Sequence, residues 1–158
     1  MGKTDLIAEP GKQEFTVTRV FDAPPELVFK AHTDPALLAR WLRPKGYTMT
    51  VNEMDARAGG SWRFVHSDRE GHAYGFHGVH HTVTPGRIDR TFEFEGWPGH
   101  VSLETLTLAA QDGKTKMTVH AVYQSVADRD GMIASDMEEG MSESFSLLDA
   151  LLKELQLP

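Results

Sequence analysis

The sequence contains no cysteine, which excludes a disulfide framework and a thiolate zinc site. No stretch approaches the roughly 18 apolar residues of a membrane span. The first residues, "MGKTDLIAEPGKQ", lack the apolar core of an export signal. We therefore expect a cytoplasmic protein.

Positive charge is also scarce. Sixteen Lys and Arg residues face 23 Asp and Glu residues, and the net charge at pH 7 is −7. Such a chain is a poor candidate for binding nucleic acid or an anionic membrane. The sequence has no G-x-S-x-G, no Walker loop, no H-E-x-x-H and no G-x-G-x-x-G that opens a helix. We therefore expect no cofactor and no metal.

The 158 residues are enough for one domain with a real core. Residues 1–13 are polar and are predicted to form a flexible N-terminal arm, followed by a single domain over 14–158. The alternating segment "FTVTRVFD" predicts a strand, and prolines near the first turn predict short helices over about 25–32 and 34–42.

Six further alternating segments lie between Tyr47 and about Gln124, separated by Gly, Asp and Pro clusters. With no helical stretch between them, they predict an antiparallel meander of seven strands in total. From 128 to 155, apolar residues recur every three or four positions, which predicts one helix roughly 40 Å long. "SVAD" before it resembles a capping box.

A long helix with one apolar face must bury that face, and so must a seven-stranded sheet. The expected fold is therefore α+β, with the sheet curled around the terminal helix and the two short helices at one end. A helix is only about 10–12 Å wide, so part of the concave face is left as a candidate cavity. Gly140, in the middle of the helix, predicts a close approach to the sheet.

Four segments together resemble a known family: "FDAPPELVFKAHTDPALLARWLRP", "EMDARAGGSWRF", "FHGVHHTVTPGRIDRTFEFEG" and "DRDGMIASDMEEGMSESFSLLDALL". They are similar to bacterial homologues of the activator of the heat-shock-protein-90 ATPase, within the SRPBCC superfamily that includes START domains. The resemblance implies a helix-grip fold and an internal pocket for an apolar or amphipathic small molecule. The eukaryotic activator uses a separate N-terminal region for much of its chaperone contact. Only about 13 residues precede the first strand here, so we do not expect a chaperone partner.

The predicted ligand-binding residues are aromatic, methionine and a few polar side chains that face the terminal helix or lie on it. They are Trp41, Trp62, Phe64, His66, Phe76, His80, Arg90, Phe92, Tyr123, Met137, Met141 and Phe145.

Three histidines occur within five residues in "FHGVHHTV". On a strand His80 shares a face with Phe76, whereas His77 and His81 point the other way. We expect His80 to face inward, with a β-bulge near His80–His81. His77 and His81 would lie roughly 13 Å apart along the strand, too far to share a metal ion.

Arg90 lies on the apolar face of "RIDRTFEFE", whose other face (Arg87, Asp89, Thr91, Glu93 and Glu95) is predicted to be solvated. A buried guanidinium needs a partner. Arg90 could hold a carboxylate or enolate oxygen of a ligand, or pair with Glu53 or Glu104.

Three functions fit these features: a small-molecule binding protein, a cyclase- or hydratase-like enzyme that uses His80 or His66, and an interaction module for a chaperone. Binding is the reading that we favour. The sequence leaves homodimerisation open.

Overall fold

A computed structural model describes residues 2–158 and shows an α+β fold with one antiparallel sheet. The strands are β1 (Asp5–Ile7), β2 (Glu14–Phe21), β3 (Thr48–Met54), β4 (Ser61–Ser67), β5 (Ala73–Thr84), β6 (Arg87–Phe94), β7 (Val101–Gln111) and β8 (Lys114–Val122). The helices are α1 (Pro25–Thr33), α2 (Pro35–Trp41), α3 (Val126–Ala134) and α4 (Met137–Leu155).

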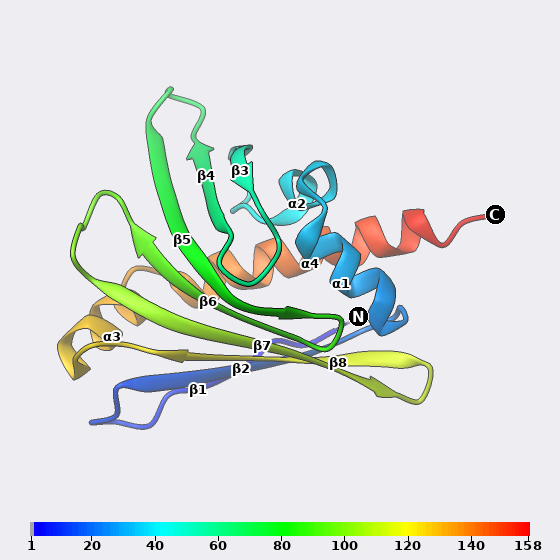
Figure 1. The fold of residues 1–158 in the computed structure, drawn as a ribbon, viewed down its shortest axis with the longest axis horizontal. Helices are drawn as coiled ribbons and strands as arrows, with labels where there is room; N and C mark the ends of the chain where they lie inside the picture. The colour runs from blue at the N-terminus through cyan, green and yellow to red at the C-terminus, as the bar shows by residue number, and fades with distance from the viewer. Residues whose placement is uncertain (1) are drawn as a thin grey trace.

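The sheet order is β1-β2-β8-β7-β6-β5-β4-β3, so the strands from β3 to β8 form the predicted antiparallel meander. The sheet is strongly curved, and α4 crosses its concave side while α1 and α2 lie near one end (Figure 1). Short turns between strands favour this arrangement, because antiparallel neighbours can be joined by a tight loop.

The prediction of seven strands was wrong, because the described chain forms eight. Residues 5–7, which we expected in a flexible arm, form β1 and pair with β2, with Leu6 opposite Val17. Arg19 on β2 also donates to Thr4 Oγ1 at 2.6 Å. A three-residue strand is too short to show alternation, and the open edge of β2 is what orders it.

The prediction of one terminal helix over 128–155 was also wrong, because α3 and α4 are separate. The chain turns at Asp136, which has φ 60°, a left-handed conformation that Asp tolerates better than most residues. Apolar residues recur on both sides of this turn, so the period alone did not reveal it. The predicted cap is present: the Ser125 hydroxyl accepts from the Asp128 amide at 3.0 Å.

The core lies where α4 packs on the sheet and on the two short helices. Phe145 and Leu148 of α4 meet Phe21 of β2, Val28 of α1 and Trp41 of α2 in one buried cluster. Trp41 Nε1 donates to the Ala31 carbonyl at 2.9 Å, which ties α2 to α1. No helix within residues 2–158 combines the length and the apolar character needed to cross a membrane.

Candidate ligand-binding cavity

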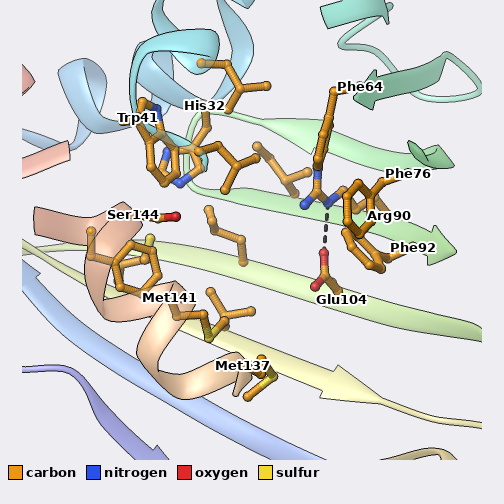
Figure 2. Close-up of a pocket in the computed structure, with 18 of the residues that line it drawn as sticks. His32, Trp41, Phe64, Phe76, Arg90, Phe92, Glu104, Met137, Met141 and Ser144 are labelled. Carbon is orange, nitrogen blue, oxygen red and sulfur yellow. Dashed lines mark hydrogen bonds and ion pairs between the residues drawn. The ribbon is translucent and has the colours of Figure 1, made fainter. Parts of the chain in front are cut away.

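A cavity of about 260 Å³ lies between the concave face of the sheet, α4 and the region around α2. Figure 2 shows Met137 and Met141 on α4, Phe76 and Phe92 on the sheet, and Trp41 on the helical side. Cavities that hold small molecules measure about 300–1,000 Å³, so this one lies just below the lower end of that range.

The predicted residues line this cavity, with the exception of Trp62. Trp62 is buried, and its ring stacks against Phe64 with centroids 5.2 Å apart. The Arg90 guanidinium covers it, 4.4 Å from the ring centre. Trp62 shares the inward face of its strand but lies behind Arg90. Whether the lining residues bind a ligand stays a prediction.

Several lining residues were not identified from the sequence, including His32, Glu104, Leu106, Met132, Gly140 and Ser144. His32 lies four residues after Val28, on the buried face of α1, and this spacing was the available signal. Glu104 was considered only as a partner for Arg90.

The environment of Gly140 differs from our expectation. A Cβ atom built there would meet nothing within 4 Å, so no backbone approaches it closely. Gly140 borders the cavity instead. The tight contact of this helix is one turn further on, where Ser144 Oγ donates to the Arg43 carbonyl at 2.9 Å.

A polar row crosses the floor of the cavity, since His80 opposes Arg90 and Arg90 opposes Glu104 in the sheet register. Arg90 Nε lies 2.9 Å from Glu104 Oε1, as the dashed line in Figure 2 marks. The protein thus supplies the partner that this half-buried cation requires, and of the two candidates it is Glu104.

His80 is buried and faces the cavity, and the register shifts between His80 and Thr82, so the predicted orientation and the predicted bulge are both confirmed. His81 is exposed. His77 lies on the outer face, with its Nδ1 2.9 Å from Glu95 and its Nε2 3.4 Å from Glu93.

The outer face of β6 is less solvated than we expected, because Asp89 is buried. Asp89 accepts from Arg87 at 2.9 Å and from Thr105 at 2.6 Å. These bonds, above all that from Arg87, lower the pKa of Asp89 to about 2. Within residues 2–158, no three His, Cys, Asp or Glu side chains gather closely enough to hold a metal ion.

Three histidines border the cavity, and each points one ring nitrogen at a backbone carbonyl. His32 Nδ1 lies 2.7 Å from Val28 O, His66 Nε2 lies 2.7 Å from Leu42 O, and His80 Nδ1 lies 3.0 Å from Asp55 O. A carbonyl oxygen only accepts hydrogen bonds, so each of these nitrogens carries the proton.

Burial lowers the pKa of all three imidazoles. It takes the pKa of His32 from 6.5 to about 4 and depresses the pKa of His66 and His80. The positive charge of Arg90 acts in the same direction on the pKa of His32 and His80. Burial also raises the pKa of Tyr123, which therefore keeps its proton.

The consequence is a set of neutral imidazoles near pH 7. General acid–base catalysis is most efficient when the pKa of the group lies near the working pH. Depressed values make these histidines weaker bases than an exposed imidazole. The arrangement is better suited to accepting hydrogen bonds than to moving protons.

Comparisons with known proteins agree with this architecture. The family model described as "Activator of Hsp90 ATPase homolog 1-like protein" matches residues 22–153. No curated protein matches the chain.

Several solved bacterial structures are similar. A protein of Rhodobacter sphaeroides is 30% identical, with a TM-score of 0.87 over 95% of this chain and 99% of that one. A protein of Chromobacterium violaceum is 30% identical, with a TM-score of 0.77 over 87% of this chain and 96% of that one. A protein of Mycobacterium smegmatis, 24% identical over 95% of this chain and 97% of that one, shares the fold with a TM-score of 0.86. Because the family model spans most of the sequence, the chain belongs to the Activator of Hsp90 ATPase homolog 1-like family.

Proposed function

We propose that this protein binds a small apolar or amphipathic molecule in the cavity between its sheet and α4, in a helix-grip arrangement. The observation that carries the proposal is the cavity itself, about 260 Å³ in volume and bordered mainly by apolar side chains. Mostly apolar walls with a few placed polar groups are the usual form of a ligand site. Membership of a family whose fold suits ligand binding supports it.

Apolar burial supplies most of the binding free energy in such a site, at about 0.8 kcal/mol for each buried methylene group. Met132, Met137 and Met141 border one side of the cavity. Methionine side chains are flexible and polarisable, so this side can adapt to ligands of different shape. The polar groups then orient the ligand.

Activation of a chaperone ATPase, which the family description names, finds less support in this chain. On the outer sheet face Arg63 holds Glu95 through two hydrogen bonds of 2.8 Å, beside His77. Val79 and Leu103 are exposed nearby. Ion pairs beside two apolar side chains form a mixed surface, whereas an interaction module would need a contiguous apolar patch.

The test uses the fluorescence of N-phenyl-1-naphthylamine, which rises in an apolar environment, together with native mass spectrometry of the purified protein. Leu106→Trp places a large ring into the cavity, whereas Leu103→Trp on the same strand points outward. We expect the probe to bind the unaltered protein and Leu103→Trp, and to bind Leu106→Trp weakly. Thermal melts establish that both variants are folded.

Absence of probe binding together with absence of a co-purified small molecule would contradict the proposal. Equal binding by the two tryptophan variants would place the probe outside the cavity and would count against it as well.

A further inference from the structure

Four of the polar side chains that border the cavity share one feature: each gives its hydrogen to a backbone carbonyl in the wall. His32, His66 and His80 donate to the backbone oxygens of Val28, Leu42 and Asp55. The hydroxyl of Ser144, on α4, donates to Arg43 O at 2.9 Å. Four groups from α1, β4, β5 and α4 thus use their donors on the protein.

What remains on these groups is acceptor capacity. A neutral imidazole whose N–H is engaged offers only the lone pair of its other nitrogen, and a hydroxyl that donates still accepts. Those nitrogens are Nε2 of His32, Nδ1 of His66 and Nε2 of His80. Among residues 2–158, the fully buried side-chain atoms without a hydrogen bond are Arg19 Nε and Trp62 Nε1, so none of these three imidazole nitrogens is a sealed, unpaired atom.

The charged pair on the cavity floor has no net charge, although the Nη groups of Arg90 remain as donors beside it. Glu104 accepts from Arg90 Nε at 2.9 Å and neutralises its charge, while the guanidinium rests on the Trp62 ring. An organic carboxylate that enters would meet the charge of Glu104 as well as the histidine lone pairs. A neutral donor would meet groups that need a hydrogen.

We propose that the cavity selects neutral, mostly apolar molecules that carry a hydrogen-bond donor, such as a hydroxyl or an N–H group, over carboxylates and over molecules with acceptors alone. This inference rests on the proposed ligand-binding function and names the class of ligand. The lowered pKa values of His32, His66 and His80 support it, because they keep these imidazoles neutral near pH 7.

Three probe molecules of equal heavy-atom count test the selectivity: 1-decanol, its isomer methyl nonyl ether, and nonanoate. Their affinities are measured by displacement of N-phenyl-1-naphthylamine at neutral pH, where nonanoate is ionised. One hydrogen bond to a buried acceptor gives roughly a three- to tenfold gain. We therefore expect 1-decanol to bind about three- to tenfold more tightly than the ether, and nonanoate to bind most weakly.

Glu104→Gln tests the electrostatic part, since it removes the carboxylate and leaves the Arg90 charge without its counter-ion. We expect this variant to gain affinity for nonanoate relative to 1-decanol. Glu53→Gln on β3 is the matched control, because Glu53 is exposed and does not border the cavity. It should retain the selectivity of the unaltered protein.

Long-range proton–nitrogen correlation spectra test the tautomers without any ligand. We expect the proton on Nδ1 in His32 and His80 and on Nε2 in His66. Addition of 1-decanol should shift the unprotonated nitrogen of at least one of them.

The outcomes separate the two proposals. If N-phenyl-1-naphthylamine and all three probes fail to bind, the ligand-binding function is wrong and this inference falls with it. If the ether binds as tightly as 1-decanol, if nonanoate binds most tightly, or if the histidines carry the opposite tautomers, ligand binding stands and only the selectivity is wrong.

Discussion

Gly140 offers a direct test of the cavity, because its replacement should raise stability and lower binding together. A Cβ atom there would meet nothing within 4 Å, and the residue borders the cavity from the first turns of α4. Glycine inside a helix costs about 1 kcal/mol relative to alanine. Gly140→Ala should therefore raise the free energy of unfolding by about 1 kcal/mol.

Gly140→Leu adds apolar burial to the same gain. A fully buried leucine side chain contributes about 1.5–3 kcal/mol, and one that only borders a cavity contributes a fraction of that. Leucine costs slightly more in helix propensity than alanine. We expect a total near 2 kcal/mol, which corresponds to a rise in Tm of about 4–8 °C for a domain of this size.

Urea unfolding and calorimetry measure the stability, and N-phenyl-1-naphthylamine fluorescence measures the binding. Gly131→Ala is the control: it replaces a glycine within α3 whose Cβ would make ordinary contact with Trp97 at 3.8 Å, away from the cavity. It should give a similar gain from helix propensity and unchanged probe binding. A Gly140→Leu protein that is less stable, or that binds the probe as well as before, would refute the reasoning.

Three further predictions concern buried charge. Asp149→Ala should lower the free energy of unfolding, measured with urea, by about 3–5 kcal/mol, because it leaves the buried Arg19 guanidinium without the carboxylate that lies 2.5 Å away. Arg19→Met should lower it by less, and the opposite order would contradict this explanation. The pKa of His32 is about 4 in the folded protein, whereas the ordinary pKa of histidine is 6.5, so the unfolded chain binds more protons between these two pH values. The free energy of unfolding should therefore fall by up to about 3 kcal/mol on acidification from pH 6.5 to 4. His32→Phe should flatten that part of the stability–pH curve, and an unchanged slope would show that another group causes it. The pKa of Asp89 is lowered to about 2, so the stabilisation that this carboxylate provides is present above its ordinary pKa of 3.8 and is lost as the pH falls through about 2. Asp89→Asn should lower the free energy of unfolding at pH 7 and reduce the further loss of stability on acidification. Unfolding curves that shift equally at pH 7 and pH 3 would count against this role.

Local patterns were sufficient for much of the fold. The alternation of apolar residues predicted the meander, and Pro25 and Pro35 marked the two short helices. The position of His80 on its strand predicted that it faces inward, beside a bulge. These features depend on the backbone period and on neighbouring residues, so they can be read from a short stretch of chain.

Other features depend on residues far apart in the sequence, and only the folded chain decided them. β1 exists because β2 has a free edge. Gly140 borders a cavity rather than a tight contact, and Arg90 pairs with Glu104 rather than with Glu53.

The cavity chemistry shows the same limit. His66 and His80 direct their N–H groups at the carbonyls of Leu42 and Asp55, 24 and 25 residues earlier in the chain, and nothing in their local sequence predicts this. His32 instead meets Val28 O, four residues earlier in its own helix. The sequence by itself determined which side chains face inward, because a strand or helix assigns its faces residue by residue. The tertiary structure decided which inward groups meet, how their hydrogens are used and how much space is left, because these depend on the packing of segments that are distant along the chain.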